Sequence, residues 1–255
     1  MIRRIRPIMQ RAATCLFILF ATNAWALDAD RVNKLLNNPN RDLSDKLNDK
    51  LNKPLELMTF FGFDEGMTIL DVYAADGYFS VILSAVVGDK GTVIAQNTTR
   101  ALSYQVDRTD VTAGEVLQQK LEKLSLINVE RLDQSMAQLE LEPESLDGVL
   151  LSKIFHDFYN RNPARAQQLL LKLKIALKPG GVIGLIDHNG NIKNDNLRFH
   201  RIPKKTVIDA VKMAGFVVDA ESDLLGNPKD NHLRSIFEPA LNKNTDRFVL
   251  RIIKQ

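Results

Sequence analysis

The segment at 67–80 constrains the fold most, because it predicts a buried strand, a tight turn and the start of a helix in immediate succession. Its apolar run ends in an acid, Asp71, and small residues then lead to Gly77. This order is typical of the nucleotide-binding corner of an open α/β sheet, where ligands lie beyond the carboxyl end of the first strand. A helix that begins near Gly77 presents its positive end to a carboxylate. The alternative is a tight strand-to-helix turn that binds nothing.

The first 26 residues predict an export signal. Four arginines between positions 3 and 11 precede an apolar run at 12–21, and Ala24-Trp25-Ala26 then supplies an A-x-A cleavage pattern. The apolar run is about half of the roughly 20 residues that a membrane-spanning helix needs. We therefore expect cleavage after Ala26, a periplasmic location and no stable membrane span afterwards, with an uncleaved anchor as the alternative.

Removal of this signal changes what the composition implies. The whole chain has 34 Lys and Arg against 31 Asp and Glu, and the signal holds four of the arginines and no acid, which leaves 30 against 31. No basic surface therefore indicates nucleic acid as a partner. Cys15 is the only cysteine and leaves with the signal, so disulfides, thiolate metal sites and cysteine nucleophiles are excluded from the exported chain. The remaining length of about 229 residues is enough for one large hydrophobic core.

Residues 27–60 predict a helical arm, and residues 61–255 predict one α/β domain. The arm is polar, is broken at 37–40, and resumes at Pro54 with a helix that Gly62 ends. Beyond it, apolar runs alternate with helical patterns, which predicts a mostly parallel sheet covered on both faces. The stretch 224–245 has no helical pattern, so we expect the last strand to be inserted antiparallel. We predict a Rossmann-like, doubly wound sheet with seven strands at 68–72, 92–95, 128–132, 146–151, 182–187, 216–220 and 247–253, and helices at 78–87, 113–124, 164–177 and 204–214.

Five segments between residues 53 and 253 carry a family resemblance: 53–54 with 60–62, 70–78, 155–157, 177–188, and 220–225 with 245–250. The run L-K-P-G-G at 177–181, placed before a strand, is a frequent methyltransferase signal. The chain resembles class I S-adenosylmethionine-dependent methyltransferases, and more narrowly the predicted exported methyltransferases of bacteria. The narrower resemblance rests on the His-Asp and Asp-His pairs and on the Thr-Asp-Arg-Phe tail.

The resemblance implies S-adenosylmethionine as the cofactor, although the sequence departs from the family pattern in two places. The family turn reads D-x-G-x-G-x-G, whereas Tyr73 and Ala75 replace two of its glycines. At the end of the second strand, Gln96 and Asn97 replace the acid that usually accepts from the ribose hydroxyls. Neutral amides accept less strongly than a carboxylate, and a polar residue that only closes the strand is the alternative. The expected cofactor-binding residues are Asp71, Tyr73, Ala75, Gly77, Gln96 and Asn97, with Asp133 and Gln134 beside the adenine and Ser152 after the fourth strand.

The expected catalytic residues are His156, Asp157 and His188. His156 follows the fourth strand and is interpreted as a general base whose tautomer Asp157 fixes; a histidine that only caps the next helix is the alternative. The pair Asp187-His188 ends the fifth strand, and His200 follows in the next loop. A metal site formed by these three histidines, with Asp157 or Asp187 adding an oxygen ligand, is the alternative. Because the histidine spacing matches no known metal motif, the sequence predicts no metal site.

These features predict a methyltransferase that uses S-adenosylmethionine and acts on a small molecule or an envelope component. Two alternatives remain: a non-catalytic binding protein that keeps the fold, and a pocket for another nucleotide-like ligand. Function depends on the site rather than on the fold, and the sequence identifies neither the methyl acceptor nor the oligomeric state.

Overall fold

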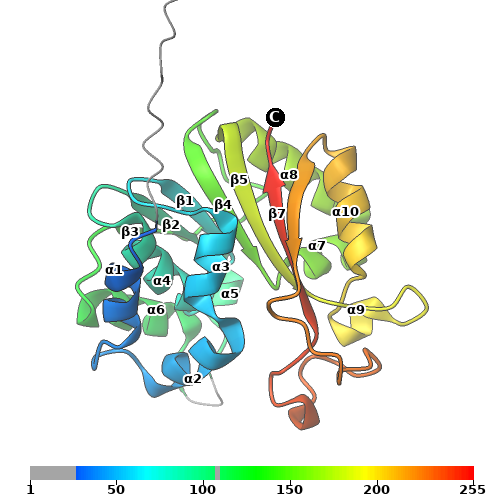
Figure 1. The fold of residues 1–255 in the computed structure, drawn as a ribbon, viewed down its shortest axis with the longest axis horizontal. Coiled ribbons are helices and arrows are strands. Elements are labelled where there is room, and N and C mark those ends of the chain that lie inside the picture. Colours follow the sequence, from blue (N-terminus) through cyan, green and yellow to red (C-terminus); the bar gives the residue numbers. More distant parts are fainter. Residues whose placement is uncertain (1–26, 107–109) are drawn as a thin grey trace, which may run out of the picture.

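One seven-stranded sheet organises the molecule, in the order β3-β2-β1-β4-β5-β7-β6 (Figure 1). The computed structural model describes residues 27–106 and 110–255, so the predicted export signal lies outside the described residues. The strands are β1 (Thr68–Val72), β2 (Thr92–Gln96), β3 (Val129–Leu132), β4 (Leu146–Ser152), β5 (Leu177–His188), β6 (Val217–Ser222) and β7 (Arg247–Ile253). This architecture confirms the predicted doubly wound α/β fold.

The strand directions also match the prediction. The pairs β1–β2, β1–β4, β2–β3 and β4–β5 are parallel, whereas β7 lies antiparallel between β5 and β6. The connection from β6 to β7 contains only a short 3-10 helix, η1 (Pro239–Leu241), which is too short to cross a face of the sheet. β5 begins five residues earlier than expected, because Leu177 already pairs with Leu146 before a register shift.

Helices cover both faces of the sheet, as the two hydrophobic clusters show. One face is covered by α1 (Ala29–Leu36), α3 (Pro54–Phe61), α4 (Tyr78–Val87) and α6 (Ala113–Lys123). The other is covered by α7 (Phe155–Arg161), α8 (Pro163–Ala176) and α10 (Lys204–Met213). The remaining helices are α2 (Leu43–Asn52), α5 (Thr99–Leu102) and α9 (Asn196–Phe199); the sequence did not predict α5, α7 or α9. No helix in the described part of the chain is both long and apolar enough to cross a bilayer.

The N-terminal arm is joined to the end of the sheet where the parallel strands finish. The Tyr78 hydroxyl, at the start of α4, donates to Asp49 of α2 at 2.9 Å. The buried Lys120 of α6 contacts Asp45 of α2 at 3.0 Å and Asp76 of the β1–α4 turn at 3.1 Å. Buried ion pairs of this kind fix relative position more than they add stability. The arm therefore holds the N-terminus of α4 in place.

Two strand glycines allow aromatic rings to lie directly on the sheet. A Cβ atom at Gly184 would lie 2.7 Å from the ring of Phe61, and one at Gly148 would lie 2.7 Å from Phe63. Both rings are almost completely buried. The end of α3 can therefore pack against β4 and β5 only because these strand positions lack side chains.

Candidate functional site

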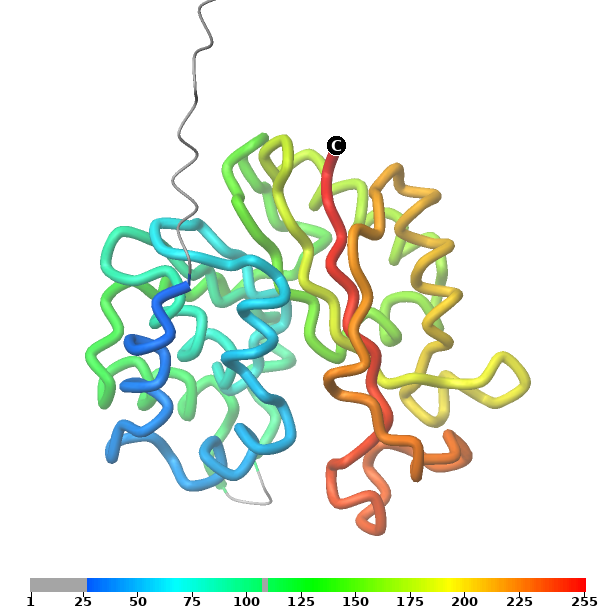
Figure 2. The backbone as a smooth tube through the Cα atoms, viewed as in Figure 1, coloured from blue at the N-terminus to red at the C-terminus, as the bar shows by residue number. Residues whose placement is uncertain are grey.

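The site lies at the carboxyl edge of the parallel strands, where several segments distant in sequence come together. Figure 2 shows the arm (blue), the segment after β5 (yellow) and the β6–β7 connection (orange to red) reaching the same end of the sheet. Parallel strands place all their carboxyl ends at one edge, which is where ligands bind in open α/β sheets. Most of the site residues expected from the sequence lie there.

The β1–α4 turn has a left-handed backbone at three positions, with φ of 55° at Tyr73, 52° at Ala75 and 82° at Gly77. Glycine is required only at the last of these, because a Cβ atom there would lie 2.5 Å from Leu117. The turn keeps its shape without the other two family glycines.

Gln96 and Asn97 bind this turn from the next strand. The Gln96 side-chain oxygen accepts from the Tyr73 amide at 3.1 Å, and the Asn97 side-chain oxygen accepts from the Ala75 amide at 2.9 Å. Both side chains are completely buried. Gln96 and Asn97, which were expected to bind the ribose, therefore bind the backbone of the turn through their side-chain oxygens. This supporting role was not predicted from the sequence.

Asp71 lies at the end of β1 beneath the turn. Its carboxylate accepts a hydrogen bond from the Ser80 hydroxyl of α4 at 2.7 Å. Burial, with a further contribution from the nearby Asp76 charge, raises the pKa of Asp71 to about 7. A buried, shifted carboxyl at a strand end is a common property of functional sites.

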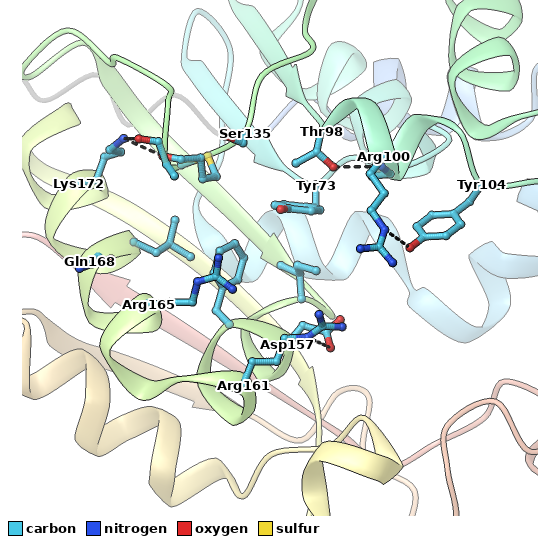
Figure 3. A pocket seen from close by; sticks show the side chains of 16 residues that line it. Tyr73, Thr98, Arg100, Tyr104, Ser135, Asp157, Arg161, Arg165, Gln168 and Lys172 are labelled. Carbon is cyan, nitrogen blue, oxygen red and sulfur yellow. Dashed lines mark hydrogen bonds and ion pairs between the residues drawn. The ribbon is translucent and has the colours of Figure 1, made fainter.

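A pocket of about 680 Å³ opens beside the turn, on the face covered by α7 and α8 (Figure 3). Its volume is within the range of small-molecule sites, about 300–1,000 Å³. The ring of Tyr73 lies in it, edge-on to Phe158 with centroids 5.6 Å apart. Thr98 and Ser135 contribute hydroxyl groups, and Ile154 and Phe158 contribute apolar surface. The residue at the first replaced glycine is therefore part of the pocket wall.

Arginine side chains line the same pocket. Arg100 comes from α5, while Arg161 and Arg165 come from α7 and α8 (Figure 3). Lys172 also lines it, but its ammonium group binds the carbonyl oxygens of Met136 at 2.7 Å and Leu139 at 2.6 Å, as well as that of Ala137. The three arginines give the pocket a positive potential. In the sequence they resemble ordinary surface charges, so they were not predicted as site residues.

The other residues expected to bind the cofactor, Asp133, Gln134 and Ser152, do not line the pocket. Asp133 pairs with Arg131 at 2.8 Å, and the Gln134 carbonyl oxygen accepts from the Gln96 side chain at 2.6 Å. Neither lines the pocket, whereas their neighbour Ser135 does. At the end of β4, the buried hydroxyl of Ser152 has no hydrogen-bond partner among the described residues.

His156 is fixed by Asp187 rather than by Asp157. Its ring Nδ1 lies 2.7 Å from one oxygen of Asp187, and its backbone amide donates to the other at 2.9 Å. Burial disfavours the imidazolium, but the Asp187 charge and hydrogen bond, aided by Asp157, outweigh it and raise the pKa of His156. The alternative that His156 only caps the next helix is wrong, because the N-cap of α7 is Ile154, this cap makes no side-chain hydrogen bond, and the His156 ring binds Asp187.

Two further histidines flank this ring. His200 Nδ1 lies 3.3 Å from Asp157, and His156 Nε2 lies 3.7 Å from the same carboxylate. His188 is instead buried, with its Nδ1 at 2.7 Å from the Thr245 hydroxyl. Burial, followed by the charge of Lys153, lowers the pKa of His188 well below its ordinary value. His188 is therefore a neutral group beneath the site.

Lys153, directly after β4, lies at the same edge of the sheet and was not predicted from the sequence. It follows β4 with a left-handed φ of 58°, and its amide donates to the Ile186 carbonyl oxygen at 2.7 Å. Burial, reinforced by the Arg247 cation, lowers the pKa of Lys153 to about 8. An amine with this pKa is partly neutral near pH 8 and can accept a proton.

No protein-family model and no curated protein matches the chain. Among solved structures, an S-adenosylmethionine-dependent methyltransferase from Aquifex aeolicus matches with a TM-score of 0.60 and 21% identity, over 89% of this chain and 98% of that one. A putative sarcosine dimethylglycine methyltransferase from Galdieria sulphuraria matches with a TM-score of 0.59 and 11% identity, over 84% of this chain and 87% of that one. The [4+2]-cyclase SpnF matches with a TM-score of 0.57 and 14% identity, over 88% of this chain and 93% of that one. These similarities show a shared fold, and the function has to be argued from the site.

Proposed function

We propose that the chain is an S-adenosylmethionine-dependent methyltransferase that acts on a small molecule or an envelope component. The observation that carries this proposal is the position of the pocket, which lies beyond the carboxyl ends of β1, β2 and β4 and beside the β1–α4 turn. The sheet order, with β7 inserted antiparallel, and the methyltransferases among the similar structures support it.

The residues present fit this cofactor. Tyr73, Ile154 and Phe158 provide apolar surface for a planar base, and Thr98 and Ser135 provide hydroxyl groups that donate and accept. When bound, S-adenosylmethionine supplies a methyl group on a positively charged sulfur.

The chain's own residues would position the two reactants and accept a proton. The first turn of α4, fixed by Asp71 through Ser80, presents its positive end to the cofactor carboxylate. His156, held by Asp187, and the partly neutral Lys153 both follow β4 and are the groups that would accept a proton. Because methyl transfer is an in-line displacement, positioning and a deprotonated nucleophile are its main requirements.

The arginines favour one alternative. Arg100, Arg161 and Arg165 would stabilise a phosphate or carboxylate more than a sulfonium ion. The second candidate function is therefore the binding of an anionic, nucleotide-like ligand, with or without catalysis.

A ligand panel distinguishes the two functions. Thermal unfolding is measured with S-adenosylmethionine, S-adenosylhomocysteine, adenosine, ATP and NAD, since a ligand that binds only the folded state raises Tm. The methyltransferase proposal predicts the largest rise with the two S-adenosyl compounds. A larger rise with ATP, abolished by Arg165→Gln, would favour the anionic ligand. A panel without any shift would contradict both candidates.

We also propose export to the periplasm, supported by the arginines, apolar run and Ala24-Trp25-Ala26 pattern of the first 26 residues. N-terminal sequencing of the protein from a periplasmic extract should begin at Leu27. Recovery of the intact N-terminus in the cytoplasm would contradict export.

A further inference from the structure

Two histidines and one aspartate from different parts of the chain meet at the carboxyl edge of the sheet. His156 and Asp157 are in the first turn of α7, after β4, and His200 ends α9, after β5. One ligand atom from each lies within 4.8 Å of the other two. The rings of His156 and His200 are nearly perpendicular, at 86°, with centroids 5.6 Å apart.

The His156 ring is oriented as a metal-binding histidine usually is. Its Nδ1 is engaged with Asp187, which leaves Nε2 on the side of Asp157. Ligating histidines almost always bind a carboxylate, carbonyl or water through their other nitrogen, which fixes the ring and its tautomer. Asp187 is completely buried and also accepts from the amides of His156 and His188, so its own position is fixed.

His200 is also held in place for this arrangement. Its backbone is left-handed, with φ of 53°, a conformation uncommon for residues other than glycine. Its ring packs edge-on against Phe237, with centroids 4.9 Å apart, while Nδ1 lies 3.3 Å from Asp157. The local backbone therefore places this nitrogen beside the carboxylate.

The distances suit a small divalent cation. A tetrahedral ion with bonds of about 2.0–2.1 Å separates its ligand atoms by about 3.3 Å. His200 Nδ1 lies 3.3 Å from Asp157 Oδ1 and His156 Nε2 lies 3.7 Å from Asp157 Oδ2, and one ligand atom from each residue lies within 4.8 Å of the others, so small side-chain shifts would bring the three groups to this separation. Two imidazoles and one carboxylate are a donor set typical of zinc, iron(II) and cobalt(II) rather than of magnesium or calcium.

We propose that His156 Nε2, the Asp157 carboxylate and His200 Nδ1 bind a divalent transition-metal ion of the zinc class. Asp157 and His200 are about 30% and 28% exposed and Asp157 lines the pocket, so one coordination position is open on the pocket side. Arg161 Nε lies 4.0 Å from Asp157 and its side chain is 60% exposed, so it has room to turn away from a bound ion. Use of the open position to hold the oxygen of a methyl acceptor rests on the proposed function, with Lys153 rather than the metal-bound His156 accepting the proton; binding of the ion does not.

The metal site is tested with the full-length protein after removal of bound metal by a chelator. Zn²⁺ and Co²⁺ are titrated by calorimetry, and Co²⁺ is also followed by its visible absorption, with Mg²⁺ as a comparison ion. We expect one equivalent of Zn²⁺ or Co²⁺ to bind, and His200→Gln and Asp157→Asn each to weaken binding by at least tenfold. Asp187→Asn should weaken it by about 10- to 100-fold without removing a ligand.

His232→Gln is the matched control. His232 also has a left-handed backbone, with φ of 61°, and its ring also contacts a carboxylate, that of Asp246, at 2.8 Å. The control should bind Zn²⁺ as the unchanged protein does, and circular dichroism should show all variants folded. No saturable binding, equal binding by every variant, or a loss confined to His232→Gln would overturn the site. S-adenosylmethionine binding, measured separately on the metal-free protein, can fail or succeed independently of this result.

Discussion

The side-chain oxygen of Asn97 accepts a hydrogen bond from the backbone amide of Ala75 at 2.9 Å, and its nitrogen donates back to the Ala75 carbonyl oxygen at 3.3 Å. This reciprocal pair joins the end of β2 to the β1–α4 turn. It explains how the turn keeps its conformation although Ala75 replaces a family glycine. Where class I methyltransferases usually carry an acid, this chain has an amide that can both donate and accept.

Asn97→Asp tests this explanation. The carboxylate keeps the bond from the Ala75 amide but places a second acceptor against the Ala75 carbonyl oxygen, at a completely buried position. We expect a loss of about 1–3 kcal/mol in the free energy of unfolding, measured by urea denaturation. An unchanged or higher stability, with tighter S-adenosylmethionine binding, would show that position 97 serves the ribose instead.

Gly184→Ala should destabilise the protein, because the new methyl group would lie 2.7 Å from the Phe61 ring. The expected cost is about 1–3 kcal/mol, the usual range for overpacking a core. Phe61→Leu removes the crowded ring atoms, so the double variant should lose less than the sum of the two single variants. Additive losses in chemical denaturation would argue against this contact.

Asp71→Asn should remove a pH dependence of stability. The pKa of Asp71 is about 7 in the folded chain and near 3.8 in the unfolded chain, so between these values the folded state binds the extra proton. Stability from this group is therefore present below pH 4 and is lost as pH rises to about 7. The Asp71→Asn variant keeps an oxygen that accepts from Ser80. Above pH 7 its free energy of unfolding should exceed that of the original protein by a few kcal/mol, which is the energy that a pKa shift of about three units corresponds to.

The measurement for Asp71 is the difference in unfolding free energy between the two proteins from pH 4 to pH 8. Other titrating groups cancel in this difference. A constant difference across the range would contradict the burial of an ionisable carboxyl at the end of β1.

Lys153→Met has the opposite pH signature. Because the pKa of Lys153 is about 8 in the folded chain and near its ordinary value of 10.5 in the unfolded chain, the folded state binds fewer protons between these two pH values. Lys153 lowers the free energy of unfolding below pH 8, and this loss becomes smaller as the pH rises from 8 towards 10.5. The variant should unfold at a higher Tm than the original at pH 7, and the gap should narrow by pH 10. A gap that widens with pH would contradict the lowered pKa.

The sequence predicted those parts of the fold that depend on residues close together in the chain. The 67–80 segment predicted β1, the turn and α4 because an apolar run, an acid and a small-residue turn act over neighbouring positions. The two replaced glycines are not needed for the shape of the turn, since it adopts a left-handed backbone at both Tyr73 and Ala75 without glycine. β5 was expected to begin at residue 182, and its earlier start depends on the pairing of Leu177 with Leu146, which a local pattern does not reveal.

The details of the site were harder to predict because they depend on contacts distant in sequence. His156 was expected to be fixed by its neighbour Asp157, whereas Asp187, 31 positions later, accepts from its ring. Arg165 has the pattern of a solvent-facing helix residue, and only the packing of α8 beside the pocket shows where it lies. The cofactor and catalytic roles of the expected residues stay predictions for binding experiments.

The most direct test of the proposed function is calorimetric titration of the purified protein with S-adenosylmethionine and S-adenosylhomocysteine. Phe158→Ala removes an aromatic wall of the pocket, and Ile127→Ala removes an exposed side chain that does not line it. The account predicts binding of one equivalent in the low micromolar range, about −8 kcal/mol, weakened at least tenfold by Phe158→Ala and unchanged by Ile127→Ala. Absence of binding up to about 1 mM, weaker than about −4 kcal/mol, would contradict it.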